Sequence, residues 1–302
     1  MFRKYLLLAL LLWTVDCFSQ SKINDFLKPS DTLNKPRRNA VIITEASLGT
    51  LTLVGLDQLW YADFPRTNFR TIDDSDEWLQ MDKYGHVFSA YQLGRIGANA
   101  LEWSGVRKED QLIYGATLGL GFLTAVEIFD GFSAEWGFSW SDMAANGLGA
   151  GLFIGQELLW DEQRISLKYS FHQTRFADQR QDKLGDGLLE EMLKDYNGQT
   201  YWLSANVHSF FKTSKIPKWL NVAVGFGADG MLTGRNEIVD NFMTSQQRQR
   251  QFYLSLDIDF TRIQTDSRFL KTLFDVLNLI KVPFPTIEYN SKNGVKLHYI
   301  YF

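Results

Sequence analysis

The sequence is poor in cysteine and has no excess of positive charge. Cys17 is the one cysteine in 302 residues, so an intrachain disulfide and a cysteine-based zinc site are both excluded. Lysine and arginine number 31 against 35 aspartate and glutamate residues, which gives a formal net charge of −4. Non-specific nucleic-acid binding needs a cationic surface, so we expect no nucleic-acid partner.

Nucleotide-binding motifs are also missing, whereas apolar and aromatic residues are abundant. The sequence holds neither a Gly-x-Gly-x-x-Gly pattern nor a phosphate loop. Hydrophobic residues make up 45% and aromatic residues 15% of the chain, with 23 Phe and 9 Trp. This composition excludes a disordered chain and favours a membrane or membrane-interface protein over one with an ordinary soluble core.

The N-terminus has the pattern of a secretory signal. Arg3 and Lys4 precede an apolar run at 5–15, and small or polar residues follow at 19–21. The run is too short to span a bilayer, so residues 1–20 are predicted to be a cleaved signal peptide that directs the chain across the inner membrane. Cys17 raises a lipoprotein alternative, which the preceding Thr-Val-Asp does not support as a lipobox.

An extended leader is predicted over 21–38, followed by a helical domain over 39–160. Four apolar stretches, 39–61, 84–103, 112–129 and 143–160, have the length of buried or membrane-spanning helices. Gly115 and Gly119, and the series Gly147, Gly151 and Gly155, have the small-residue spacing of closely packed helices. A membrane-embedded bundle and a soluble bundle both fit this pattern.

From residue 161 the apolar period changes to two, which predicts a β domain over 161–302. The expected strands are 165–175, 200–211, 220–231, 252–260, 285–289 and 295–302, with helices at 186–194 and 267–281. The fold class is therefore α+β, with a bundle of about four helices and an antiparallel sheet of about six strands. The sheet is expected to be barrel-like, although six strands are fewer than a closed bilayer barrel needs. Long amphipathic strands and the terminal Phe302 favour the outer membrane over the periplasm and the inner membrane.

Seven polar residues at helix ends form the candidate site. Asp82 and His86 share one helix face, Glu127 and Asp130 a second, and Asp142 and Asn146 a third, with Ser139 as a candidate N-cap. His86, Glu127, Asp130 and Asp142 are candidate ligands for a divalent metal, and His86, Asp82 and Glu127 are the catalytic candidates. The alternative is that these groups pair with one another and hold the helix ends together.

The same residues carry a family resemblance over about 80–155. Asp82-Lys83-Tyr84-Gly85-His86, then Glu127 to Asp130, then Ser139-x-x-Asp142-x-x-x-Asn146-x-x-Gly149 resembles the YfiM-like family of predicted periplasmic lipoproteins of unknown function. The order of motifs is also similar to that of VanZ-like membrane proteins. The resemblance implies a location in the cell envelope more than an activity.

These patterns lead to one expected function and two alternatives. We expect a membrane-associated envelope protein with a structural or maintenance role and the lipid bilayer as a partner. One alternative is a metal-dependent envelope enzyme that acts on lipid or glycan through the Asp/His/Glu cluster. The other is a pore or transport component, for which the sequence offers no clear polar channel.

Overall fold

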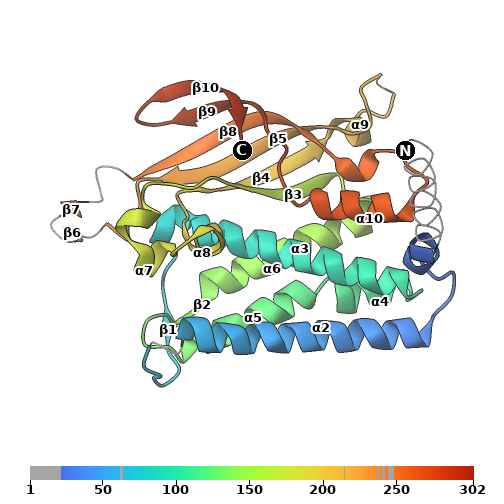
Figure 1. Ribbon diagram of the computed structural model, residues 1–302, viewed down its shortest axis with the longest axis horizontal. Helices are drawn as coiled ribbons and strands as arrows, with labels where there is room; N and C mark the ends of the chain where they lie inside the picture. Colours follow the sequence, from blue (N-terminus) through green and yellow to red (C-terminus); the bar gives the residue numbers. More distant parts are fainter. Residues whose placement is uncertain (1–21, 62–63, 214, 237, 240–241, 244–247) are drawn as a thin grey trace, which may run out of the picture.

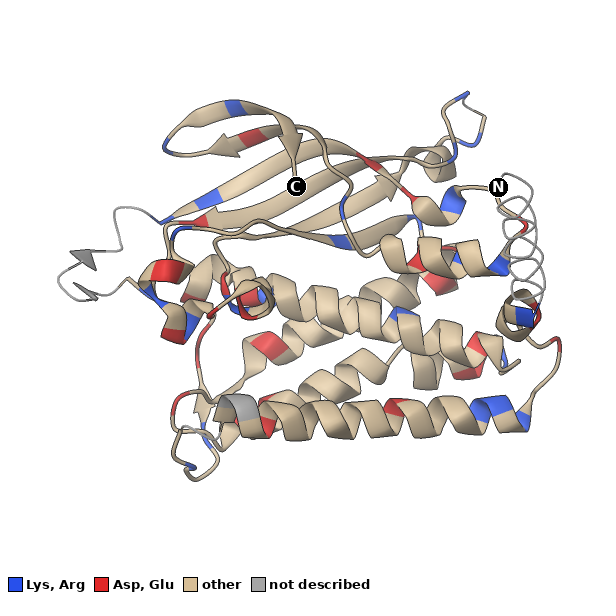
Figure 2. Cartoon of the chain, in the orientation of Figure 1, with Lys and Arg blue, Asp and Glu red and all other residues tan. Residues whose placement is uncertain are grey.

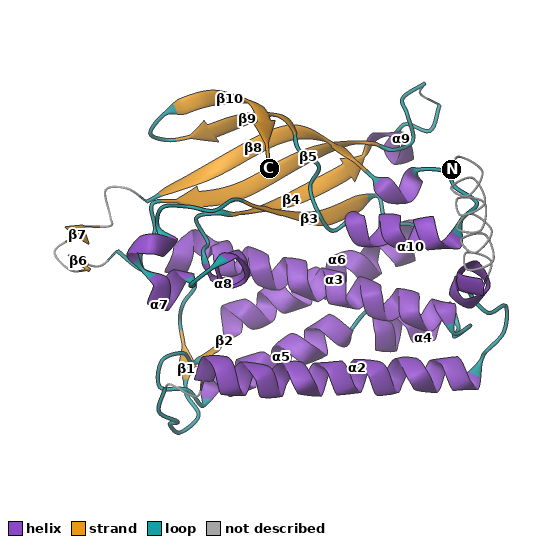
Figure 3. Cartoon of the chain, in the orientation of Figure 1, coloured by secondary structure: helices purple, strands orange, loops and turns teal. Residues whose placement is uncertain are grey.

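Helices and strands form two layers in the computed structural model. The structure describes residues 22–302 except 62–63, 214, 237, 240–241 and 244–247, so the predicted signal peptide and Cys17 lie outside the described residues. One layer consists of long helices that run along the long axis of the molecule, and a six-stranded sheet lies over it (Figures 1 and 3).

The four apolar stretches form the four long helices. These are α2 (Lys35–Leu56), α3 (Met81–Trp103), α5 (Leu118–Gly131) and α6 (Trp140–Trp160). Five short helices bring the number of α-helices with described bounds to nine rather than about four: α4 (Lys108–Asp110), α7 (Gln181–Leu184), α8 (Leu188–Lys194), α9 (Val207–Phe210) and α10 (Arg268–Leu277).

The expected extended leader is wrong over much of its length. Residues 22–27 are helical, and α2 begins at Lys35 because the Asn34 side chain accepts a hydrogen bond from the Arg37 backbone NH. Pro36 lies in the first turn, where its missing N–H costs no helical hydrogen bond. A helix start is therefore encoded by Asn34 and Pro36, upstream of the apolar stretch.

Small residues allow the long helices to cross closely, but only some of the expected ones do so. A Cβ on Gly119 would lie 2.4 Å from the Ala90 carbonyl oxygen, and a Cβ on Gly115 would lie 2.6 Å from Ala98 Cα. These two glycines therefore pack against α3 as predicted. The series Gly147, Gly151 and Gly155 instead points to open space, and it is Gly149 of α6 that lies against α3, where a Cβ would be 2.2 Å from the Val87 carbonyl oxygen.

The sheet has six antiparallel strands in the order β10-β9-β8-β5-β4-β3. Its strands are β3 (Ile165–Phe171), β4 (Gln199–Asn206), β5 (Leu220–Asp229), β8 (Gln249–Ile258), β9 (Phe284–Asn290) and β10 (Gly294–Tyr301). The sheet is not closed, because β3 and β10 are its edges and do not pair with each other. Two short strands, β6 (Ile238–Val239) and β7 (Phe242–Met243), pair outside this sheet.

Two segments depart from the predicted strand limits. Strand β4 ends at Asn206, whose side chain accepts from the Ser209 backbone NH and starts α9, so residues 207–210 are helical rather than extended. At the β3 edge, Tyr169 NH donates to Leu279 O and Lys281 NH donates to Tyr169 O. The chain that follows α10 thus covers part of this edge.

The sheet is polar on its inner, concave face and apolar on its outer, convex face, and part of the outer face packs on helix α3 through Leu167 and Tyr201. Inner residues include Lys168, Ser204, Asn221 and Asp257, all fully buried. Lys168 Nζ on β3 lies 2.8 Å from Asp257 Oδ2 on β8, although two strands separate them, which shows how strongly the sheet curls. Apolar residues that alternate with these stay exposed on the outer face: Leu203, Val222, Val224, Phe252, Leu254, Leu256, Ile287, Tyr289, Val295 and Leu297. In an antiparallel sheet of a water-soluble protein the apolar face is covered by the core, whereas here only the part around Leu167, Tyr201 and Phe226 packs on α3.

Two segments are long and apolar enough to cross a bilayer. They are Lys35–Leu56, of which 6% is buried, and Lys108–Gly131, of which 33% is buried. Helix α2 therefore exposes most of its apolar length along one side of the helical layer.

Candidate functional site

Three helix ends meet at the candidate site. The first two turns of α3 supply Asp82, Lys83 and His86, the last turns of α5 supply Glu127, and the first turns of α6 supply Asp142 and Asn146. The short parallel pair β1 (Thr71–Ile72) and β2 (Phe138–Ser139) brings Asp74 to the same place. The three predicted helix faces thus converge.

Ser139 fixes the start of α6 and ties it to the other elements. Its hydroxyl accepts from the Asp142 backbone NH, which makes it the N-cap that the sequence predicts. The same hydroxyl donates to Asp74 Oδ1 at 2.6 Å, and its backbone NH donates to Glu127 Oε2 at 3.0 Å. One residue therefore connects α6 with α5 and with the Asp74 loop.

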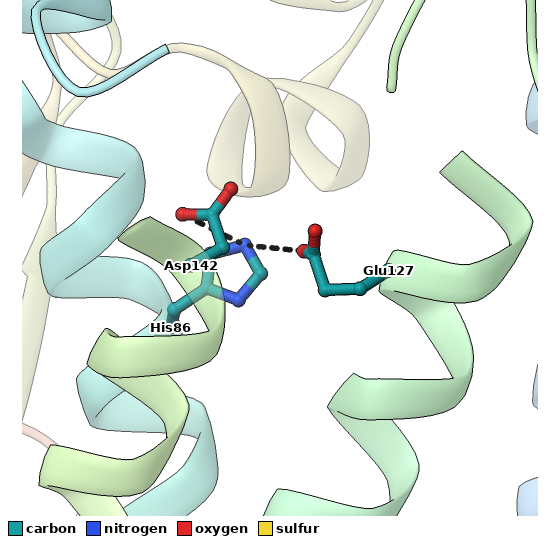
Figure 4. Close-up of side chains that lie close together, drawn as sticks. All are labelled: His86, Glu127 and Asp142. Atoms are coloured by element: carbon teal, nitrogen blue, oxygen red, sulfur yellow. Dashed lines mark ion pairs between the residues drawn. The ribbon is translucent and has the colours of Figure 1, made fainter. Parts of the chain in front are cut away.

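His86 faces two carboxylates from the other helices (Figure 4). Its Nε2 lies 3.7 Å from Glu127 Oε1 and 3.7 Å from Asp142 Oδ1. Its Nδ1 lies 2.9 Å from Asn146 Oδ1. An amide oxygen can only accept a hydrogen bond, so Nδ1 carries a proton and, in the neutral ring, Nε2 presents its lone pair to the carboxylates. One donor atom from each of His86, Glu127 and Asp142 lies within 4.8 Å of the others. We call these three residues the histidine triad.

Lys83 forms the other half of the cluster. Its ammonium lies 2.8 Å from a carboxylate oxygen of Asp74, of Asp82 and of Asp142. Donor atoms of these three aspartates also lie within 4.8 Å of one another, but the ammonium already contacts all three. We call Lys83, Asp74, Asp82 and Asp142 the lysine cluster; Asp142 belongs to both halves.

The three carboxylates that share the Lys83 ammonium differ in their pKa. Burial opposes ionisation of Asp74, but hydrogen bonds from Lys83, Ser139 and Ser141 outweigh it and lower the pKa of Asp74 to about 2. Burial raises the pKa of Asp82 to about 6 despite the Lys83 contact. Burial also raises the pKa of Asp142, with His86 and Lys83 opposing it. The pKa of Lys83 is raised, because attraction to Asp82 and Asp142 exceeds the effect of its own burial.

One predicted residue, Asp130, has a different partner, and two residues of the site were not predicted. The Asp130 carboxylate accepts a 2.6 Å hydrogen bond from the Tyr61 hydroxyl and is not one of the triad donors. Sequence reasoning missed Lys83 and Asp74 as members of the site. Lys83 lies inside the quoted motif next to Asp82, but position i+1 points to a different helix face, so helical spacing alone could not select it. Asp74 lies in a loop where no periodicity applies.

A cavity of about 290 Å³ adjoins the cluster. Asp82 and His86 line it from α3, together with Leu123 of α5, Tyr169 and Tyr201 of the sheet, and Met192 and Leu193 of α8. The site is therefore buried at Glu127 and Asp142 but reaches an open space at His86, whose side chain is 20% exposed.

Comparison with known protein families matches the part of the chain that holds the site. Residues 72–155 match the family described as predicted periplasmic lipoprotein (DUF2279). The family resemblance predicted from the Asp-Lys-x-x-His and Ser-x-x-Asp motifs is confirmed over this segment, which contains every residue of the histidine triad and of the lysine cluster. The description supports a location in the cell envelope. No curated protein and no solved structure matched the chain.

Proposed function

We propose that this protein is a membrane-embedded envelope protein with a maintenance role, in which the histidine triad holds a divalent cation. The observation that carries the proposal is the convergence of His86, Glu127 and Asp142 from three helices, with donor atoms within 4.8 Å of one another. The proposal has two parts, lipid contact and cation binding, and each is tested separately.

Lipid contact is supported by the inverted polarity of the sheet. A polar inner face and an apolar outer face are typical of strands that face a bilayer. Helix α2, with 22 residues, is about 33 Å long, and ten-residue strands such as β5 and β8 have about the same length, which is close to the thickness of a hydrocarbon core. In α2 the basic residues Lys35, Arg37 and Arg38 lie in the first turn, and Glu45 is the one charged residue in the rest of the helix (Figure 2). The outer membrane is favoured, since inverted sheets belong to that membrane.

Lipid contact is tested by fractionation. Inner and outer membranes are separated on a density gradient after a carbonate wash, and the mature protein is expected in the washed outer membrane. Recovery in the washed inner membrane would contradict the outer-membrane assignment alone. Release into the soluble periplasm would contradict lipid contact altogether.

Cation binding is supported by donor type and spacing. A divalent metal with donors at about 2.0–2.2 Å places neighbouring donors a little over 3 Å apart, close to the 3.7 Å between His86 Nε2 and either carboxylate. The hydrogen bond from Nδ1 to Asn146 is the outer contact that fixes a metal-binding imidazole. Carboxylates also outnumber Lys83 in the buried cluster, so a dication would balance charge that the chain itself leaves uncompensated.

Elemental analysis tests cation binding directly. Protein purified without added metal is expected to retain about one equivalent of a divalent ion, and a chelator is expected to lower its thermal midpoint. His86→Ala should lose the ion, whereas Asn293→Ala, in a distant turn, should keep it. Wild-type protein that neither retains nor rebinds a divalent ion would contradict this part.

A second candidate function is a metal-dependent enzyme that acts on lipid or glycan. The observation that favours it is the cavity at His86, because a metal with three protein donors keeps a position open for water or substrate. In that case His86→Ala abolishes turnover while the fold is kept. In the maintenance role, metal removal changes stability only.

A further inference from the structure

The cavity next to the cluster has a chemical character of its own. Four aromatic residues line it: Phe88, Tyr169, Tyr196 and Tyr201. Three of these rings contact one another, with centroid distances of 5.8 Å for Phe88 and Tyr169, 5.8 Å for Phe88 and Tyr201, and 5.5 Å for Tyr169 and Tyr201. They therefore form one continuous aromatic wall.

Two of the tyrosine hydroxyls are already used within the protein. Tyr169 OH donates to the Met192 carbonyl oxygen at 2.7 Å, and Tyr201 OH donates to Gln199 Oε1 at 2.8 Å. Gln199 in turn donates to the Met192 carbonyl oxygen at 3.0 Å. These bonds fix the rings, so the wall offers π surface to a ligand more than hydroxyl groups.

One carboxylate lines the same cavity as this wall. Asp82 is the carboxylate among the lining residues, and no lysine or arginine lines the cavity among the described residues. His86 of the histidine triad lines the cavity as well, so a cation held there would repel an ammonium group and is left out of the test below. An aromatic wall combined with a carboxylate is the combination that binds alkylammonium groups, because ring faces and carboxylate both attract a cation with an apolar coat.

The protein already binds one alkylammonium group, which is the side chain of Lys83. Lys83 Nζ is an alkylammonium that Asp74, Asp82 and Asp142 each contact at 2.8 Å. Asp82 also lines the cavity, which has about 290 Å³ of space, the liquid volume of roughly ten water molecules. That space is sufficient for a choline-sized group.

We propose that this cavity binds an alkylammonium group, as carried by the head group of a zwitterionic lipid or by a free amine. At its border, Met192 and Leu193 of α8 are 37% and 67% exposed, and the neighbouring Leu189 is 79% exposed. An apolar chain attached to the ammonium group therefore has exposed apolar surface to lie on. The site does not depend on the proposed cation of the histidine triad.

The test is a titration of the detergent-solubilised protein, purified in an uncharged maltoside and kept in chelator. Choline is compared with its uncharged isostere 3,3-dimethyl-1-butanol by calorimetry. Choline is expected to bind about tenfold more tightly or better, because the isostere lacks the charge that the rings and Asp82 attract. Equal binding of both compounds, or binding of neither by folded protein, would overturn the proposal.

Variants locate the site and show which source of ammonium it prefers. Tyr196→Leu is expected to weaken choline binding about fivefold. Tyr299→Leu, at a residue of β10 that is 85% exposed, is expected to leave it unchanged. Equal effects of the two substitutions would overturn the assignment to this cavity. Tighter binding of dodecylphosphocholine than of choline assigns the site to lipid head groups, and equal binding assigns it to free amines. Because chelator is present throughout, failure here leaves the cation proposal standing.

Discussion

The two halves of the polar cluster share Asp142 but have different chemistry. In the lysine cluster an ammonium contacts three carboxylates at 2.8 Å, so the cation that those carboxylates need is part of the chain. In the histidine triad the closest contacts between His86 and the carboxylates are 3.7 Å, too long for direct hydrogen bonds. We therefore propose that the first half holds helix ends together and that the second receives a ligand. The predictions below test this difference, from the largest effect to the smallest.

Lys83→Met is expected to have the largest effect on stability. It leaves three buried carboxylates without their counter-ion, which typically costs about 3–5 kcal/mol in the free energy of unfolding. Denaturant unfolding in detergent measures the change, with Lys271→Met on the exposed side of α10 as the control. A loss for Lys83→Met no larger than that of the control would show that the lysine cluster does not hold the helices.

The pH dependence of stability should separate Asp82 from Asp74. The pKa of Asp82 is about 6 in the folded protein and near 3.8 in the unfolded chain, so the folded state binds more protons and stability falls as pH rises from about 4 to about 6. Asp82→Asn should remove the share of this slope that Asp82 contributes, worth at most about 3 kcal/mol, and leave the share of Asp130, whose pKa burial also raises to about 6. The pKa of Asp74, about 2, acts in the opposite direction: its stabilisation is complete above about 4 and is lost as pH falls toward 2.

Unfolding midpoints of the apo protein across pH 2–8 check both slopes. Asp74→Asn should flatten only the acid limb, and Asp82→Asn only the limb between about 4 and 6. Identical profiles for the two variants would contradict the conclusion that the pKa of Asp74 is lowered while that of Asp82 is raised.

Glu127→Gln should reduce cation affinity by about 100-fold or more, because it removes a carboxyl donor of the histidine triad whose pKa burial raises to about 8 and which a bound cation would ionise. Ser141→Ala is the matched control, since Ser141 donates to Asp74 in the lysine cluster and is not a triad donor. Metal titration by calorimetry measures both. Similar losses of cation affinity in the two variants would mean that the cation site is not confined to the histidine triad.

Asn146→Leu should have a smaller effect of about 10–100-fold on cation affinity, because Asn146 orients the imidazole without contributing a triad donor atom. His86→Ala in the same titration gives the upper limit of the loss. An Asn146→Leu variant with wild-type affinity would show that the Nδ1 contact does not position His86.

Much of the fold could be predicted from periodicity, because apolar spacing reports directly on helices and strands. The four long helices and six strands were found close to their expected ranges. Side-chain capping was harder to see: Asn34 and Asn206 each start a helix where an extended segment was expected. Contacts between helices could not be predicted from residue spacing within one helix. Gly147, Gly151 and Gly155 have the spacing of a helix contact but do not make one.

The candidate site could be predicted in part for the same reason. Positions four apart on a helix identified Asp82 with His86 and Asp142 with Asn146, and the structure brings both pairs together. Lys83 and Asp74 depend on the approach of other chain segments, which no spacing within one helix reports. Asp130 has the right spacing to Glu127, but its carboxylate pairs with Tyr61.

The inverted sheet also bears on how the protein reaches its folded state. In water, burial of apolar surface would favour turning Val224, Leu254 and Ile287 inward and would oppose a curl that encloses Lys168 and Asp257. In the proposed location the folding free energy therefore includes transfer of the outer face from water to lipid. The stability of the protein then depends both on its sequence and on the lipid or detergent around it. Detergents with different micelle cores should therefore give different unfolding midpoints for an unchanged sequence.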